Sequence, residues 1–430
     1  MPHGFSGDIY DERMRVMVER PDFETARDLL LAYTPVTGTE EIGLSGSAGR
    51  VLAQEILAAE DVPGFDRSPY DGYAFRAQDV QGADSLHPVT LSVVDEIAAG
   101  EVPHAAITIG TAARIMTGAP VPSGADAIVP YEVTRFTDTE VQIFQEAAAG
   151  QNIVRRGEDV QKGQRLAAPG IKIDAGLCGV MAAQGVFRPR VYKKPVVGII
   201  STGSELVDEG QPLSRGKIYN TNRYTLEAAC ASLGCRPVYL GMGKDSTKEI
   251  ADLILHGVQG TDAPRCDVVL LTGGVSAGDF DLTPDAMQMA GAKILIRGLR
   301  LKPGMAGAYG VIQKDNTIPV LAFSGNPAAC MTAFWLVGAP VLRKLAGWNK
   351  PRLTEIRCAL MNRFPKKSGA TRVLRGKLVF TEGKACLAID EKQGNSVLSS
   401  AIGTDLLAVI PAGSGPMEAG AVLRGFRITD

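Results

Sequence analysis

Apolar side chains recur at helical spacing soon after the start of the chain. Phe23, Ala26, Leu29, Leu30 and Tyr33 would share one face of a helix. The positions between them are mostly polar, so the pattern predicts an amphipathic helix over residues 23–33.

From about residue 61 to 163 the pattern changes to short apolar or alternating segments, such as 90–94 and 126–130. Gly, Pro and Asp residues separate these segments. This combination is typical of short strands joined by turns. We therefore predict a small β-rich domain over residues 61–160.

After Pro189 apolar strand-like runs alternate with helical patterns. The predicted strands are 196–200, 237–240, 268–271 and 320–323, and the predicted helices are 225–233, 246–258, 284–290 and a long apolar helix from 327 towards 345. Ser246 and Glu249 have the spacing of a capping box. The alternation predicts a doubly wound, mostly parallel α/β domain over residues 191–346. Its strands are too apolar to face water on either side.

The last part of the chain loses this alternation. Short apolar segments at 372–375, 387–389 and 406–410 are separated by Gly, Asn and Ser clusters. A small C-terminal β domain over residues 347–430 is the expected result.

Composition narrows the function classes. A chain of 430 residues exceeds one ordinary core, and its net charge of -2 provides no general attraction for nucleic acid or an anionic membrane. The first residues lack the apolar run of a signal peptide, so a cytoplasmic protein is expected. Seven scattered cysteines without a paired spacing are expected to be reduced thiols.

Three strand ends carry similar turns of glycine and small hydroxyl residues. Ligands of open parallel sheets bind outside the carboxyl ends of the strands, where such turns can present backbone N–H groups to a phosphate. The alternative is that they are only tight turns between strand and helix. The candidate residues are Thr202, Gly203, Ser204, Thr272, Gly273, Gly274, Ser276, Gly278, Ser324, Gly325, Asn326 and Pro327.

Acidic residues follow the same strands. Glu205, Asp245, Asp279 and Asp281 would repel a phosphate unless a divalent cation lay between them. Mg²⁺ is commonly held by one or two carboxylates together with phosphate oxygens. The pattern predicts Mg²⁺-assisted chemistry on a phosphoanhydride, although acids near helix starts also serve as caps.

Basic residues precede a Pro-Gly turn. Arg297, Arg300 and Lys302 alternate before Pro303 and Gly304, which would place them on one face of a strand and towards an anion. An ordinary solvated strand face is the alternative.

The β-rich region contains a second concentrated segment, residues 63–74. It holds Asp66, Asp71 and three aromatic residues among turn formers, a combination that favours a functional loop. Segments 114–122 and 155–159 repeat this signal more weakly. The four histidines lie outside all of these clusters, so the sequence does not support histidine-based catalysis.

Eight of these segments occur in one order that resembles a known family. Together they resemble the molybdopterin molybdenumtransferases, of the bacterial MoeA type and the gephyrin E domain. The resemblance implies a four-part subunit, with an elongated linker domain from residues 1–60 and 161–190 and a C-terminal β-barrel-like domain. It also implies a homodimer whose cleft is shared between the α/β domain of one subunit and the β-rich domain of the other. The segments are 66–74, 115–122, 155–159, 201–206, 218–222, 272–278, 302–304 and 325–327.

The resemblance further implies a reaction. Adenylylated molybdopterin and molybdate, with Mg²⁺, would yield molybdenum-loaded molybdopterin and AMP. Partner proteins would be a molybdopterin adenylyltransferase and recipient molybdoenzymes. The implied catalytic residues are Glu205, Asp245, Asp281, Asp66 and Thr117, of which the first three would bind the metal. The implied substrate-binding residues include Asn220, Lys302, Pro303, Gly304, Arg375 and Ser399 beside the three turns.

The chain departs from the family pattern at the predicted oxyanion side. Met305 and Ala306 replace the second half of a Lys-Pro-Gly-Lys-Pro motif, Gly298 replaces a basic residue, and Ala328 and Ala329 follow Pro327. Losing two cations is expected to weaken attraction for molybdate unless Arg297 or Arg300 faces the cleft. The alternatives are a tungstate-preferring version of the reaction, a molybdopterin adenylyltransferase and a non-enzymatic scaffold.

Overall fold

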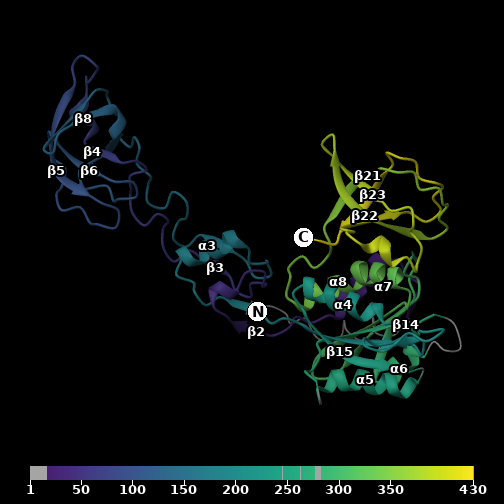
Figure 1. Cartoon of the computed structure of the whole chain (residues 1–430). Coiled ribbons are helices and arrows are strands. Elements are labelled where there is room, and N and C mark those ends of the chain that lie inside the picture. Colours follow the sequence, from purple (N-terminus) through teal and green to yellow (C-terminus); the bar gives the residue numbers. More distant parts are fainter. Residues whose placement is uncertain (1–16, 245, 262, 277–281, 430) are drawn as a thin grey trace, which may run out of the picture.

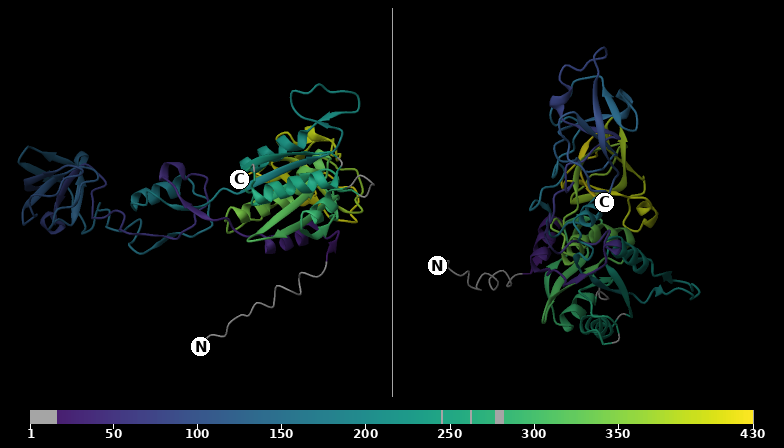
Figure 2. Two further views of the ribbon diagram at one scale, coloured as in Figure 1. Left: turned by 90° about the horizontal axis from the view of Figure 1, so that it is seen from below. Right: turned by 90° about the vertical axis from the view of Figure 1, so that its left-hand side faces the viewer.

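The computed structural model describes residues 17–429 except 245, 262 and 277–281. The molecule is elongated, with a β-rich lobe at one end, a narrow linker in the middle and a larger lobe at the other end (Figure 1). The left view of Figure 2 shows the same separation of the lobes. The predicted multi-domain α/β plus β architecture is confirmed.

The larger lobe contains a seven-stranded sheet in the order β1-β17-β19-β20-β16-β12-β15. Only β19 runs antiparallel to its neighbours, and neither it nor β17 was predicted. The strands are β1 (Val18–Glu19), β12 (Val196–Thr202), β15 (Arg236–Gly243), β16 (Val268–Thr272), β17 (Ala292–Arg297), β19 (Gly307–Gln313) and β20 (Thr317–Phe323).

Helices cover both faces of this sheet, as predicted. One apolar core joins the sheet to α2, α4 and the long helix, and a second core joins it to α5 and α6. The side chain of Asp22 caps α2 by accepting a hydrogen bond from Thr25 N (2.7 Å), and Ser246 caps α5. The helices are α2 (Phe23–Tyr33), α4 (Thr221–Ser232), α5 (Thr247–Gln259) and α6 (Thr283–Met289).

The long apolar helix is continuous but changes its winding. It consists of α7 (Pro327–Ala333), a π-helical turn (Phe334–Gly338) and α8 (Ala339–Leu345). Pro340 has no N–H to continue the α-helical bonds, which accounts for the wider turn before it. The helix is long and apolar enough to cross a membrane, but 89% of its most apolar window is buried inside the protein. It is therefore a core helix.

The β-rich lobe is a single six-stranded sheet in the order β7-β4-β6-β5-β9-β8. Buried aromatic and aliphatic side chains, including Tyr73 and Phe75, form its core. The strands are β4 (Gly72–Phe75), β5 (Val89–Ile97), β6 (Thr111–Ile115), β7 (Ala127–Pro130), β8 (Thr134–Phe136) and β9 (Glu140–Ile143).

The linker has little regular structure. Two antiparallel strand pairs and one helix, α3 (Ala175–Ala183), surround a small apolar core. The pairs are β3 (Ile56–Leu57) with β10 (Arg165–Ala167) and β2 (Thr39–Glu41) with β11 (Arg190–Tyr192).

The C-terminal part closes into a barrel. Its strands follow the order β22-β23-β21-β25-β24, and β24 pairs again with β22. The short strand β18 (Leu301–Lys302) extends from the α/β sequence and pairs with β22. The barrel strands are β21 (Glu355–Leu360), β22 (Thr371–Thr381), β23 (Lys384–Ile389), β24 (Leu406–Ile410) and β25 (Val422–Arg427).

Candidate functional site

The three glycine-containing turns lie side by side at one edge of the α/β sheet. Strands β12, β16 and β20 are adjacent and parallel, with Ser201 opposite Thr272 and Thr272 opposite Phe323. Thr202 Oγ1 donates to Thr272 O (3.1 Å), and Gly273 N donates to Phe323 O (3.0 Å). These two bonds join the three turns along the edge, where the side chains of Thr202 and Thr272 are buried.

Two glycines in the middle turn have a backbone that other residues adopt only under strain. Gly273 has φ +96°, and a Cβ there would lie 2.4 Å from Thr202 O. Gly274 has φ +61°, and a Cβ there would lie 2.6 Å from Thr283 Oγ1. Thr283 also donates from Oγ1 to Gly273 O (2.9 Å), which holds the turn against the start of α6. The sequence carried no signal for this contribution of Thr283.

Asn220 fixes the start of α4 beside the first turn. Its Oδ1 accepts from Ser201 Oγ (3.1 Å) and from Arg223 N (3.3 Å), and the residue is buried. The neighbouring Asn222 donates from Nδ2 to Gly325 O (2.9 Å), which ties α4 to the third turn. In the described structure Asn220 therefore joins the end of β12 to the start of α4.

The third turn has the predicted arrangement at the start of the long helix. Asn326 is the N-cap position and Pro327 the first helical residue, although the Asn326 side chain makes no capping hydrogen bond. Instead Asn326 N donates to Ser324 Oγ (3.3 Å). Ala328 N donates to Asn395 O (3.1 Å) of the C-terminal part, so this helix end is partly covered.

Glu205 is the predicted metal ligand whose position the structure describes. Its side chain is exposed and folds over Gly203, where a Cβ would meet a carboxylate oxygen at 2.5 Å. Within the described residues its carboxylate forms no ion pair. Asp245, Asp281 and Gly278 lie outside the described residues, and no group of three potential metal ligands occurs among the residues that are described.

The basic segment before Pro303 does not form one strand, which corrects the expectation of a single charged face. Arg297 ends β17, Gly298 turns the chain at φ +65°, and Lys302 lies in β18. Arg300 is 68% exposed at its side chain and faces Asp22 (Nη2 to Oδ2, 3.8 Å). Arg297 instead lines a cleft of about 400 Å³ together with Ser276 and Met305.

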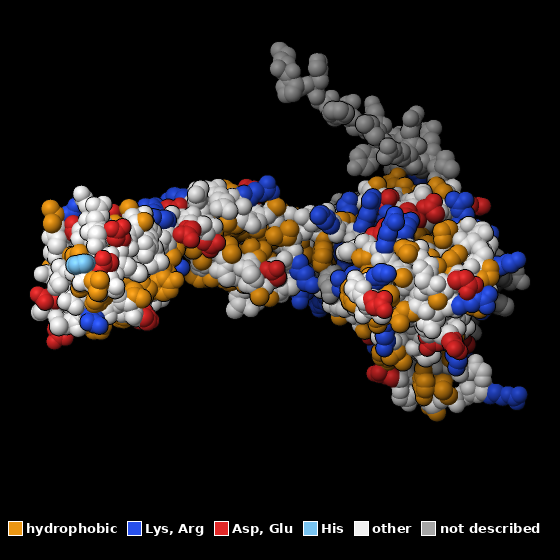
Figure 3. Space-filling model, turned by 90° about the horizontal axis from the view of Figure 1, so that it is seen from above, with side chains coloured by type: hydrophobic (Ala, Val, Ile, Leu, Met, Phe, Trp, Pro, Cys, Tyr) orange, Lys and Arg blue, Asp and Glu red, His pale blue; other side chains and the backbone are white. Residues whose placement is uncertain are grey.

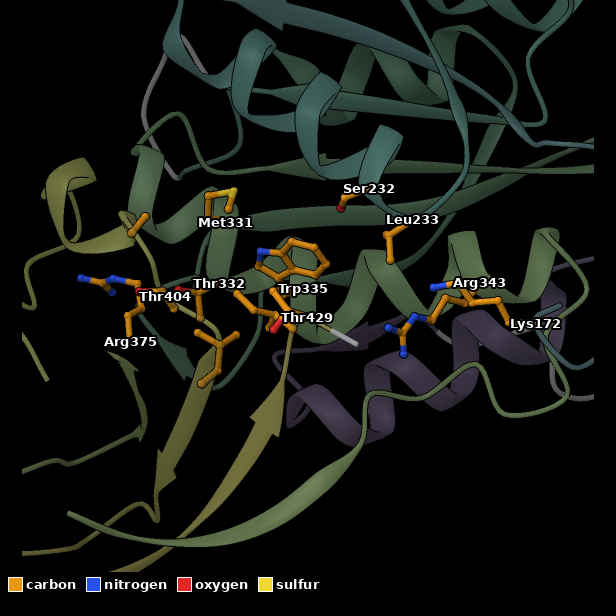
Figure 4. Close-up of a pocket in the computed structure, with 13 residues that line it drawn as sticks. Lys172, Ser232, Leu233, Met331, Thr332, Trp335, Arg343, Arg375, Thr404 and Thr429 are labelled. Carbon is orange, nitrogen blue, oxygen red and sulfur yellow. The ribbon is translucent and has the colours of Figure 1, made fainter. Parts of the chain in front are cut away.

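Arg375 is almost fully buried, at 1% exposure, in the C-terminal barrel. Its Nε donates to Ser400 Oγ (3.0 Å) and its Nη2 donates to Gly394 O (3.1 Å). Burial lowers the pKa of this guanidinium to about 10. Figure 4 shows its charged end pointing away from Trp335. Ser399, the predicted ligand, is exposed, and sequence reasoning missed its neighbour Ser400.

The β-rich lobe brings together the three segments that the sequence singled out there. Asp66 accepts from Arg155 Nη1 (2.7 Å) and Arg156 N (2.8 Å), and the backbone bond from Arg156 is the largest cause of its lowered pKa. Asp71 accepts from Thr117 N (2.6 Å) and Thr117 Oγ1 (2.8 Å), which likewise lowers its pKa. The two carboxylates therefore connect the loop to the segments around Thr117 and Arg155.

The two groups of candidate residues lie towards opposite ends of the elongated molecule. The loop around Asp66 lies in the β-rich lobe, and the three turns lie in the larger lobe beyond the linker (Figure 1). One chain therefore does not bring Asp66 and Thr117 to the sheet edge.

Three family models match consecutive parts of the chain. The MoeA N-terminal region (domain I and II) matches residues 22–185. A probable molybdopterin binding domain matches residues 198–344. The MoeA C-terminal region (domain IV) matches residues 357–424.

Similar proteins cover nearly the whole chain. A molybdopterin molybdenumtransferase of Bacillus subtilis (strain 168) is 34% identical over 396 residues, which cover 91% of this chain and 90% of that protein. One of Staphylococcus aureus (strain COL) is 31% identical and covers 88% of each chain. The crystal structure of the molybdopterin biosynthesis moeA protein from Pyrococcus horikoshii OT3 has a TM-score of 0.80 at 28% identity, covering 95% of this chain and 100% of that chain.

Proposed function

This chain belongs to the MoeA family of molybdopterin molybdenumtransferases, and we propose that it inserts molybdenum from molybdate into adenylylated molybdopterin with release of AMP. The observation that carries this proposal is the row of three adjacent turns at the carboxyl edge of the sheet. Such an edge suits a ligand with several phosphate oxygens, because glycine turns let N–H groups approach them closely.

We propose that Glu205 binds Mg²⁺. An exposed carboxylate without an ionic partner among the described residues, next to a phosphate-binding turn, is the kind of ligand that Mg²⁺ takes. Asp245 and Asp281 are proposed to complete the set. When bound, the ion would neutralise charge on the phosphoanhydride. Glu205 itself would orient the ion, and the turns would hold the phosphate oxygens.

Lys302 and Arg375 are proposed to attract the oxyanion, with Ser399 beside them. The pairing of β18 with β22 links the Lys302 segment to the strand that carries Arg375. A buried guanidinium with two of its nitrogens fixed by Ser400 and Gly394 is well oriented for an anion.

A homodimer is proposed because one chain does not complete the cleft. The linker offers a surface for a second copy: in α3 only Met181 is buried, and the exposed Phe187 follows the helix. Figure 3 shows hydrophobic side chains on this linker, between the two lobes. A small-residue helix face of this kind allows close helix packing.

The dimer has a direct test in Gly179→Arg. A Cβ at Gly179 meets nothing within 4 Å, so the monomer tolerates the change whereas a helix interface would not. Sedimentation should show a dimer for the native chain and a monomer for the variant. Gly415→Arg, in the C-terminal part outside the linker and also in open space, serves as the control. A native monomer would refute the shared cleft.

The reaction is tested with purified protein and adenylylated molybdopterin. AMP should appear only when molybdate is added with Mg²⁺. Release without an oxyanion would contradict the proposal, and adenylylation of molybdopterin by ATP would instead support the adenylyltransferase. Replacing molybdate with tungstate at matched concentrations measures the anion preference.

A further inference from the structure

Arg297 lines a cleft at the edge of the α/β sheet. The cleft of about 400 Å³ is bordered by Val275 and Ser276 after β16, by Arg297 and Gly298 after β17, and by residues 305–307 before β19. Since β17, β20 and β16 all end at the same edge, this cleft continues the row of turns already described.

The guanidinium of Arg297 has unused hydrogen-bonding capacity. Its Nη1 is buried and has no hydrogen-bond partner among the described residues. Buried donors of this kind are rare in folded proteins unless a ligand or water satisfies them. Arg300, three residues later, is instead exposed and faces Asp22.

Charge in the cleft favours an anion. Arg20 and Arg297 line it, and Glu19 is the acidic residue among its described lining. Glu19 is exposed and forms no ion pair with Arg297 in the described structure. The described lining of the cleft therefore carries a net positive charge.

The backbone accounts for the position of this cation. At residue 298 this chain has glycine at φ +65°. A Cβ there would lie 3.1 Å from Met305 O and 3.3 Å from Arg20 Cγ. A side chain at 298 is therefore strained, whereas the preceding strand residue projects into the cleft without strain.

We infer that Arg297, with Ser276 beside it, forms a binding subsite for a tetrahedral oxyanion. The ligand is a dianion with oxygen acceptors, either free molybdate or a phosphate group of the nucleotide-bearing substrate. A guanidinium binds such oxygens in pairs, which a lone lysine does not. This inference rests on the proposed function for its choice of ligands.

Direct binding separates the inference from the catalytic proposal. Calorimetric titration of the purified protein with molybdate, and separately with AMP, requires no turnover. Arg297→Gln should lower the affinity for one of these two ligands about tenfold, as expected for the loss of one charge-assisted contact. Arg300→Gln is the matched control, because it removes the same charge from the same segment outside the cleft. It should change neither affinity more than about twofold.

A second substitution distinguishes a loss of anion binding from misfolding of the variant. Met305 lines the same cleft and is 56% exposed, so Met305→Lys in the Arg297→Gln background should restore most of the affinity. Weakened molybdate binding assigns the subsite to the free oxyanion, and weakened AMP binding assigns it to the substrate phosphate. Unchanged affinity for both ligands, or an equal loss in Arg300→Gln, would overturn the inference. An absence of AMP release by the native chain would count only against the proposed reaction.

Discussion

The edge of the α/β sheet and the loop around Asp66 are built on different principles. At the sheet edge, hydrogen bonds from buried hydroxyl and backbone groups join the turns, and the exposed Glu205 is left without an ionic partner among the described residues. In the β-rich loop the carboxylates of Asp66 and Asp71 already accept hydrogen bonds from neighbouring segments. The carboxylate of the first region is therefore free of described ionic partners, whereas those of the second are already hydrogen-bonded. Because the two regions lie at opposite ends of one chain, the proposed cleft requires a second chain.

The largest expected effect is at Glu205. Glu205→Gln removes the charge proposed to hold Mg²⁺ and should lower kcat/KM by about a thousandfold, with an unchanged melting temperature. Rates are measured as molybdate-dependent AMP release over a range of Mg²⁺ concentrations. Glu209→Gln is the control, because Glu209 is also exposed and follows shortly in the same segment, where it accepts from Tyr224 OH (2.7 Å). Equal losses in the two variants would deny Glu205 a special role.

A substitution in the glycine turn at the sheet edge should also lower the free energy of unfolding more than one at an open glycine. Gly273→Ala places a Cβ 2.4 Å from Thr202 O at φ +96°, and should cost about 3 kcal/mol in the free energy of unfolding. Gly210→Ala has φ +78° but open space around it, so it should cost only about 1 kcal/mol. Urea unfolding of both variants measures the difference. Equal costs would mean that the close contact at the turn is unimportant.

A smaller effect is expected at Asp66. Asp66→Asn keeps an acceptor for Arg156 N but loses the charge paired with Arg155, so kcat/KM should fall roughly tenfold. The same change at Asp84, an exposed residue of this lobe that accepts from His87 N, provides the control. Activity and melting temperature are recorded for both. A loss confined to stability would make the Asp66 loop structural only.

The smallest expected effect is on how the contact between Asp71 and Thr117 depends on pH. Its pKa is lowered from 3.8, mainly by the backbone N–H of Thr117. A carboxyl with a depressed folded pKa stabilises the folded state above its unfolded pKa and loses that contribution as pH falls through the folded value. Protection of the Thr117 amide against hydrogen exchange should therefore persist at pH 3.8, where an ordinary aspartate is half protonated, and be lost only on further acidification. Asp71→Asn should weaken this protection throughout; unchanged exchange would refute the assignment.

The sequence predicted the parts of this molecule that depend on local pattern. The helix over 23–33 has the predicted bounds, and the capping residue Ser246 lies where its spacing indicated. The strands β17 and β19 were not predicted. The basic residue Arg297 and the glycine after it made the end of β17 hard to recognise, and β19 is antiparallel, so it does not follow the alternation of parallel strands with helices. Pairing direction depends on neighbours distant in sequence, which periodicity does not encode.

The candidate site, too, was predicted only where it depends on local sequence pattern. Glycine and hydroxyl turns after apolar strands were recognisable, since the chemistry and the fold position coincide in sequence. The support from Thr283 and Asn222, and the contact of Arg375 with Ser400, were not predicted. Each joins residues through the folded structure, and the side chains involved are common polar types without a local signature.

Mixing two impaired chains tests the shared cleft most directly. Glu205→Gln and Asp66→Ala are purified separately, mixed in equal amounts under conditions that exchange subunits, and assayed for molybdate-dependent AMP release. In a mixed dimer one cleft would combine both changes and the other would have neither, so about a quarter of the native activity should return. If each chain contained its whole site, every cleft would carry one change. The mixture would then stay as impaired as its components, which would contradict the account.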